Sequence, residues 1–251
     1  MATATAQTIN PAKFYTEARL PESDGKPMAE TDRHRNVMVY VIEALEERFR
    51  AEHEVYVSGN IFLYYRDEDH ELKSISPDVL LVKGVEKKQR RIYNMEVEHK
   101  APEVVFEMTS PSTKTEDLGN KRFIYASLGV KEYYLFDPYG ETLRPALRGF
   151  RLENGDYLPV VGTRMYSQAL GLEIRLEDGK LLLYDRQTQE YLRSYHESEA
   201  ARRTAEAARR AAEAMQRETD AARRAAEARA VAAETELQRL RLQLENLQSK
   251  A

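Results

Sequence analysis

Two acidic residues interrupt apolar stretches of this chain, and their types could hold a metal ion. Asp78 begins the predicted strand in "SPDVLLVKG", and Glu107 lies inside "EVVFEMT". Alternation along a strand places Glu107 on one face with Val105 and Thr109, so an ionised carboxylate there needs a partner. Two carboxylates completed by water molecules suit Mg²⁺, which prefers oxygen ligands and keeps several waters.

A lysine adds a third charge to this group. Lys121 falls in the middle of an apolar helical stripe that is formed by Leu118, Ile124, Tyr125 and Leu128. Burying an ammonium is costly unless it is paired. The simplest arrangement is that the three charged side chains meet, with Lys121 balancing the carboxylates or a metal bridging them. The alternative is a structural ion pair between Lys121 and Glu107, with Asp78 as a turn residue.

The elements around these residues predict an α/β fold with a mixed sheet. Periodicity predicts a helix over 31–50, capped by Thr31 or Asp32, and another over 113–128, for which Thr113 and Glu116 form a capping box. The segments that read as strands are "HEVYVSGN", "IFLYY", "SPDVLLVKG", "EVVFEMT" and "KEYYLFDP". Two further segments read as β-hairpins, with turns at Asn154-Gly155 and Asp178-Gly179.

Composition changes sharply near Glu197, which divides the chain into a domain over 1–196 and a tail over 197–251. The tail is rich in Ala, Glu and Arg and contains no Gly or Pro, so it predicts a long C-terminal helix. A small or apolar stripe follows a heptad pattern with one stutter and ends in Leu237, Leu240, Leu244 and Leu247. This pattern favours a coiled coil that makes the protein a homodimer or higher homo-oligomer. A solvated single helix with Glu/Arg pairs is the alternative.

The order of these charged residues resembles that of the PD-(D/E)XK nuclease superfamily. Pro77-Asp78 begins one strand, and Glu107 lies in the next core strand. Thr109 occupies the position where that motif expects its lysine. The segments "SPDVLLV", "VVFEMTSPSTKTEDLGNKRFIYASLGVKEYYLFDP" and "ALGLEIRLEDGKLLLYD" resemble the Uma-two family of restriction endonucleases, in which the lysine is displaced onto the following helix. Lys121 matches that displaced position.

The resemblance implies a restriction-endonuclease-like PD-(D/E)XK core over 1–196 and a metal-dependent endonuclease that hydrolyses DNA. Asp78 and Glu107 would hold Mg²⁺ or Mn²⁺, helped by the backbone carbonyl of Met108. Lys121 would orient the attacking water or stabilise the developing negative charge.

Four further residues are candidates for lining the site. His34 lies on the inward stripe of the first helix, although a structural core histidine is the simpler interpretation. Thr109 stands where the motif expects the lysine, and Ser110 and Ser112 could contact a phosphate through their hydroxyls. Helix capping explains these serines equally well.

Overall composition places limits on partners and location. The net charge of -4 provides no global attraction to nucleic acid or to a membrane surface, so DNA binding needs a local basic patch such as "KGVEKKQRR". A solvated loop is the alternative interpretation of that stretch. The absence of cysteine excludes disulfides and thiolate metal sites. With no apolar run long enough for a membrane span, we expect a cytoplasmic protein.

The nuclease hypothesis has one main rival. The chain could keep the nuclease fold without catalysis and act as a binding or scaffolding protein that self-associates through its tail. A nuclease acting on RNA or small nucleotides is a further alternative.

Overall fold

The computed structural model describes residues 20–22 and 31–248. Its six-stranded sheet contains the strand that holds Glu107 and the strand that Asp78 directly precedes. Its strands, in spatial order, are β1 (Val55–Ser58), β4 (Val79–Lys83), β6 (Val104–Met108), β7 (Glu132–Phe136), β8 (Leu147–Glu153) and β9 (Asp156–Val160). Neighbouring strands are antiparallel except β6 and β7, which are parallel. The crossover between β6 and β7 contains the helical stretch that bears Lys121.

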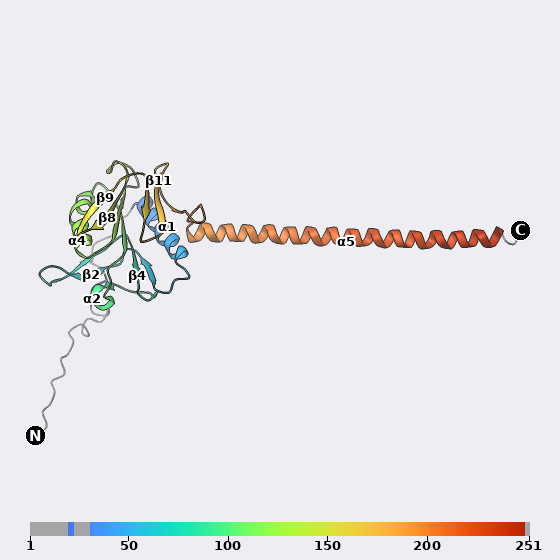
Figure 1. Ribbon diagram of the computed structural model, residues 1–251, viewed down its shortest axis with the longest axis horizontal. Helices are drawn as coiled ribbons and strands as arrows, with labels where there is room; N and C mark the ends of the chain where they lie inside the picture. The colour runs from blue at the N-terminus through green and yellow to red at the C-terminus, as the bar shows by residue number, and fades with distance from the viewer. Residues whose placement is uncertain (1–19, 23–30, 249–251) are drawn as a thin grey trace, which may run out of the picture. The chain divides into compact units, whose positions relative to one another are not determined.

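Two smaller sheets complete the strands. One contains β10 (Arg164–Ser167), β11 (Leu172–Glu177), β12 (Lys180–Asp185) and β13 (Glu190–Tyr191), and the other contains β3 (Leu72–Ile75), β2 (Leu63–Arg66) and β5 (Tyr93–Asn94). A single helical turn, α2 (Met95–Glu98), follows β5. The predicted α/β fold with a mixed sheet, additional hairpins and a long C-terminal helix is confirmed (Figure 1).

The two faces of the six-stranded sheet bury different clusters. Val104, Phe106 and Met108 of β6 pack with α1 (Asp32–Arg48) and with the inner residues of β11 and β12. Val105 lies in the second cluster, with Tyr125 and Leu135. The predicted alternation along β6 is therefore confirmed, and Glu107 belongs to the face that α4 (Arg122–Ser127) covers.

The helix that bears Lys121 is continuous in sequence but not uniform in its hydrogen bonding. It consists of α3 (Lys114–Glu116), a π-helical segment η3 (Asp117–Lys121) and α4 (Arg122–Ser127). The predicted capping box is wrong, because the Thr113 side chain makes no capping hydrogen bond to this helix. Instead, the Thr113 hydroxyl accepts a hydrogen bond from the Ser110 amide, 3.1 Å away.

The first helix, α1, agrees closely with the sequence prediction. The Thr31 hydroxyl accepts a hydrogen bond from the His34 amide, as expected of an N-cap. Met38, Val41 and Leu45 of the predicted stripe are buried. The apolar face of α1 thus covers one side of the sheet and carries His34 at its N-terminal end.

The turns of both predicted hairpins are also confirmed. Asn154-Gly155 joins β8 to β9, and Asp178-Gly179 joins β11 to β12. All four turn residues have positive φ, which is the conformation that tight two-residue hairpins require. In contrast, the strands on either side of Gly59-Asn60, β1 and β2, belong to different sheets.

The long helix α5 (Tyr195–Gln248) occupies the predicted tail, and the contacts divide the chain into two units between Tyr195 and His196. In Figure 1, α5 is drawn from orange to red. Within residues 20–22 and 31–248, no helix combines the length and the apolar character that crossing a bilayer would require.

Candidate active site

The two candidate metal-binding acids lie on neighbouring strands. In the antiparallel pair β4 and β6, Val79 is opposite Phe106, which brings the preceding residue, Asp78, beside Glu107. The Met108 amide donates a hydrogen bond to Asp78 Oδ2 over 2.6 Å. This bond ties the Asp78 carboxylate to the strand that carries Glu107.

Both oxygens of Glu107 have partners from the helical stretch that covers the sheet. Lys121 Nζ lies 2.8 Å from Glu107 Oε2, and the Tyr125 hydroxyl donates to Oε1 over 2.6 Å. The Glu107 residue is only 1% exposed, and Tyr125 is fully buried. The buried carboxylate therefore has the charge partner and the hydrogen-bond donor that its burial requires.

The Lys121 ammonium lies between two carboxylates. Besides Glu107, it contacts Oδ1 of Asp117 at 3.3 Å, four residues earlier in the helical stretch. Burial acts to lower the pKa of Lys121, but the charges of Glu107 and Asp117 together outweigh this effect and raise it above its ordinary value. Lys121 is therefore a cation at neutral pH, held in place from two sides.

The pKa of Glu107 is set mainly by burial, which disfavours its charged form. Burial raises the pKa of the Glu107 carboxyl to about 8, and the charges of Asp78 and Asp117 act in the same direction. Lys121 acts against this shift without cancelling it. In the protein alone, Glu107 therefore binds a proton more readily than an ordinary glutamate does.

The donor set fits a hard divalent cation. Lys121 contacts Glu107 and Asp117, and Asp78 lies beside Glu107. Added positive charge would therefore oppose the effects of burial and of the neighbouring acids, which raise the pKa of Glu107. Among the described residues, no group of three or more His, Cys, Asp or Glu side chains is arranged to hold a metal. Two carboxylates with waters remain a suitable set for Mg²⁺, which seldom uses an all-protein cage.

Thr109, Ser110 and Ser112 follow Glu107 closely in the chain, but their side chains lie in different surroundings. Thr109 is buried, and its hydroxyl has no hydrogen-bond partner among the described residues. Ser110 Oγ lies 2.9 Å from Ser112 Oγ and 3.2 Å from the Thr113 hydroxyl. The two serines thus bond within their own turn, and Ser112 is exposed.

His34 reaches the acidic pair from the other layer of the fold. Its Nε2 lies 3.3 Å from Asp78 Oδ2, and its side chain is 17% exposed. The sequence favoured a structural core histidine at this position. The structure instead brings its ring to one of the two candidate metal-binding acids.

Two residues of the site were missing from the sequence prediction. Asp117 was not singled out, although an acid four residues before Lys121 lies on the same side of a helix. Tyr125 was expected to be buried, but nothing in the sequence indicated that its hydroxyl would meet Glu107. Both residues contact the predicted group directly.

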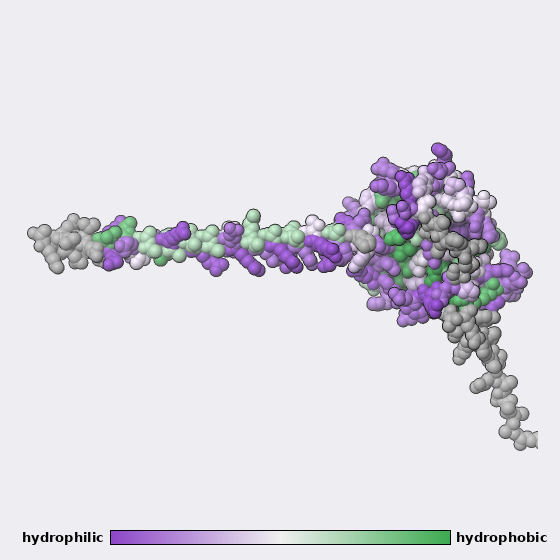
Figure 2. Space-filling view, turned by 180° about the vertical axis from the view of Figure 1, so that it is seen from behind, coloured by the Kyte–Doolittle hydropathy of each residue, from purple (hydrophilic) through white to green (hydrophobic). Residues whose placement is uncertain are grey.

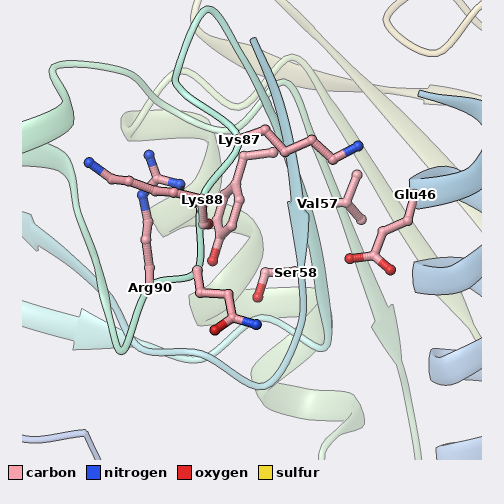
Figure 3. Close-up of a pocket in the computed structure, with 8 residues that line it drawn as sticks. Glu46, Val57, Ser58, Lys87, Lys88 and Arg90 are labelled. Atoms are coloured by element: carbon pink, nitrogen blue, oxygen red, sulfur yellow. Dashed lines mark hydrogen bonds between the residues drawn. The ribbon is translucent and has the colours of Figure 1, made fainter. Parts of the chain in front are cut away.

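The basic stretch "KGVEKKQRR" lines a different cavity of about 450 Å³. None of Asp78, Glu107 and Lys121 is among its lining residues. In Figure 3, Lys87 and Glu46 lie on one side of Ser58, and Lys88 and Arg90 lie on the other.

Several charges of this stretch are used within the protein. The Arg90 guanidinium stacks on Tyr56, 4.3 Å from its ring centre, and pairs with Glu98 at 2.7 Å. Lys87 Nζ donates to the Phe49 carbonyl. These contacts favour a structural role for both Arg90 and Lys87.

A family model and a solved structure are among the known proteins that this chain resembles. The family model Uma2, described as "Putative restriction endonuclease", matches residues 11–178, which is more than half of the chain. A crystal structure from Anabaena variabilis ATCC 29413, described as "a putative nuclease belonging to DUF820", is similar with a TM-score of 0.45 and 16% identity. That similarity covers 64% of this chain and 93% of the other. Among curated proteins, none matches this chain.

Proposed function

Because the chain belongs to the Uma2 family, we propose that it is a metal-dependent endonuclease that hydrolyses phosphodiester bonds of DNA. The observation that carries this proposal is the meeting of Asp78, Glu107 and Lys121 at the end of two central strands, with Lys121 Nζ 2.8 Å from Glu107. These three residues correspond to the two acids and the displaced lysine that the family resemblance implies.

Asp78, Glu107 and the Met108 carbonyl would hold Mg²⁺ or Mn²⁺. A bound divalent cation would polarise the phosphate and lower the pKa of a water molecule. For Glu107 to become a ligand it must give up its proton. The raised pKa of Glu107 therefore makes metal binding depend on pH.

The remaining chemistry belongs to the residues around the acids. Lys121 would orient the attacking water or stabilise the negative charge that develops on the phosphate. Asp117 would position Lys121, since its carboxylate contacts the same ammonium that contacts Glu107. Tyr125 fixes the direction of the Glu107 carboxylate through its hydroxyl.

The tail would add self-association to this activity. The heptad stripe of α5 and its C-terminal leucines support a homodimer or higher homo-oligomer. Truncation after Tyr195, followed by light scattering, tests this part of the proposal. An unchanged mass would show that the tail is not the oligomerising element.

Cleavage assays test the nuclease proposal directly. Plasmid and linear DNA, with matched RNA, are incubated with the protein in Mg²⁺, in Mn²⁺ and in a chelator. We expect cleavage of DNA only with metal, and its loss in Asp78→Ala and in Glu107→Gln.

Glu103→Gln is the matched control, because Glu103 directly precedes β6 and forms an ion pair with the exposed Lys131. This variant should cleave like the wild type. Equal activity in the wild type and in Asp78→Ala would indicate contamination and would remove the claim. Cleavage of RNA alone would change the substrate class.

A further inference from the structure

The helix α5 presents apolar side chains that no part of the described chain covers. Met215 is 71% exposed, and Leu237 and Leu240 are 50% and 51% exposed. In Figure 2, the apolar residues of this helix gather along one edge over much of its length, and hydrophilic residues gather along the other. Exposed leucines at heptad spacing are typical of a helix that packs against another helix.

Ion pairs within the helix explain only part of its charge pattern. Arg209 pairs with Glu213, and Arg223 pairs with Glu227, each four residues later. Such pairs stabilise a single solvated helix. They do not account for the leucine positions, which gain nothing from exposure to water.

The charges that flank the apolar seam are complementary to those of a second copy of the same helix. With Leu237 and Leu240 as the a and d positions of one heptad, Glu236 is at g and Arg241 is at e. In a parallel, in-register pair of helices, each g residue faces the e residue five positions later on the other helix. Glu236 would therefore face Arg241 of the second helix, and Arg241 would face its Glu236.

Two other g–e pairs along the helix show the same charge complementarity. Glu218 and Arg223 occupy g and e positions before the stutter, whose four-residue step along the seam ends at Ala230. Arg229 and Glu234 occupy the first g and e positions after it. All three sets of facing residues carry opposite charges. A parallel dimer would also keep the stutter at the same level in both helices, with leucine opposite leucine at its C-terminal end.

An antiparallel pair uses these charges less well. The antiparallel alignment that keeps the two stutters level pairs Arg223 with Glu234. Glu218, Glu236 and Arg241 would then face uncharged residues. The charge pattern thus favours the parallel arrangement over the antiparallel one.

We propose that α5 pairs with α5 of a second copy of this chain as a parallel, in-register, two-stranded coiled coil. This inference refines the self-association proposed above and is independent of the nuclease proposal. Since both chains enter such a coil from the same end, two copies of the domain would be joined to that end. A DNA-cleaving dimer would then carry two sites that are tethered together.

A charge-swap experiment on the full chain tests the pairing. Glu236→Arg places arginine opposite arginine, and Arg241→Glu places glutamate opposite glutamate, so each variant alone should dissociate about tenfold more readily. Mixed together, the two variants should form a heterodimer as stable as the wild type, because every facing pair is again opposite in charge. Sedimentation equilibrium measures all three species, and the wild type should have twice the monomer mass of 29.0 kDa.

Cross-linking tests the register independently, since the chain contains no cysteine. Leu240→Cys at the seam should form a disulfide-linked dimer on mild oxidation. Thr235→Cys, which lies on the opposite side of the helix, should not.

Three outcomes would overturn the inference. A wild type that is monomeric at all concentrations would remove self-association altogether. Dimers in which the charge variants behave like the wild type, or in which Leu240→Cys fails to cross-link, would remove the parallel register. None of these measurements depends on cleavage, so they leave the nuclease proposal to its own assay.

Discussion

The Tyr125 hydroxyl donates a 2.6 Å hydrogen bond to one oxygen of Glu107, while the Lys121 ammonium contacts the other. Both donors come from one helical stretch, four residues apart. The carboxylate is thus held in a single orientation by one face of one element. A change at either donor should affect the acid without altering the sheet.

Tyr125→Phe tests the neutral donor. Removing a hydroxyl from a buried carboxyl leaves one acceptor unsatisfied, so the free energy of unfolding should fall by about 1–3 kcal/mol. If Glu107 acts in the proposed site, cleavage should also fall by about tenfold or more. Urea unfolding and the DNA assay measure the two effects.

Tyr157→Phe is the matched control for this prediction. Tyr157 is buried in the same cluster, and its hydroxyl donates to the Val130 carbonyl rather than to the site. It should cost similar stability and leave cleavage intact. Equal activity in both variants would mean that the hydroxyl of Tyr125 has no role beyond folding.

Lys121→Met removes the charged donor and roughly keeps the volume. Glu107 and Asp117 then lose their shared cation, and breaking such a buried pair costs about 3–5 kcal/mol. We expect the low end, because the raised pKa of Glu107 lets it take up a proton instead. Thermal melting with and without Mg²⁺ should show a different metal dependence from the wild type, and cleavage should be lost.

The control for Lys121 is Lys131→Met. Lys131 is 66% exposed and pairs with Glu103 at the surface, so its loss should cost less than about 1 kcal/mol. Adding Thr109→Lys to Lys121→Met should recover part of both losses, since a lysine there shares the strand face of Glu107. If Lys121→Met changes neither stability, metal dependence nor cleavage, Lys121 does not belong to the site.

Gly59→Ala tests how closely the residue that follows β1 approaches Asp78. A Cβ at Gly59 would lie 2.1 Å from the Asp78 carbonyl oxygen and 2.7 Å from Ile42 Cδ1. Backbone cannot yield cheaply, so we expect a loss of about 1–3 kcal/mol or more and a displaced Asp78. Urea unfolding checks the first effect, and the metal dependence of cleavage checks the second.

Gly119→Ala is the corresponding control within the helical stretch. Among the described residues, no heavy atom outside the chain neighbours and the backbone of its own helical stretch lies within 4 Å of the Cβ that this change would add. Alanine is preferred to glycine in helices by up to about 1 kcal/mol, so the variant should be as stable as the wild type or more so. Destabilisation by Gly119→Ala would contradict the helical geometry described for this segment.

Asp137 provides a prediction for acid stability. Burial alone would raise its pKa, but the amides of Tyr139, Gly140, Thr142 and Leu143 donate to its carboxylate and together lower the pKa below its ordinary value. The stability that this carboxylate contributes is therefore present above the ordinary aspartate pKa and is lost as the pH falls through the lowered value.

Asp137→Asn should cost about 2 kcal/mol at pH 7, because a neutral amide replaces a charged acceptor of several hydrogen bonds. The difference from the wild type should shrink below about pH 4, where the wild-type carboxyl becomes protonated in the unfolded and then the folded chain. Urea unfolding at several pH values measures this. A difference that stays constant with pH would contradict the role of the charge. Asp156→Asn, at the exposed first residue of β9, is the control.

The sequence predicted the site best where one residue broke a strong pattern. Glu107 stood out because its neighbours in β6 are apolar, and Lys121 stood out because it lay in an apolar stripe. Glu107 is buried where the pattern placed it, and the Lys121 side chain, 14% exposed, contacts it there. The hairpins were equally predictable, because asparagine or aspartate followed by glycine marks a tight turn by its own conformational preference.

Features that depend on tertiary contacts were not predictable in this way. The capping box failed because the Thr113 hydroxyl bonds to the preceding turn, which a pattern of residue types does not reveal. Asp117 was not singled out within the predicted helix, because its burial depends on how η3 packs. Likewise, β1 and β2 flank a short turn but join different sheets, a choice that local sequence does not determine.

The π-helical segment makes the placement of Lys121 depend on how many residues the chain has there. A π turn accommodates one residue more than an α turn, so loss of the exposed Asn120 would let the stretch continue as an ordinary α-helix between the same ends. Residues on either side of the segment, such as Asp117 and Tyr125, would then keep their facing, because a π turn absorbs its extra residue without rotating the helix that follows. Regular α geometry over the present sequence would instead turn Tyr125 by about 100° relative to Asp117, the angle of one residue in an α-helix. The contacts of Asp117 with Lys121 and of Tyr125 with Glu107 therefore rely on the extra residue being held in the π turn.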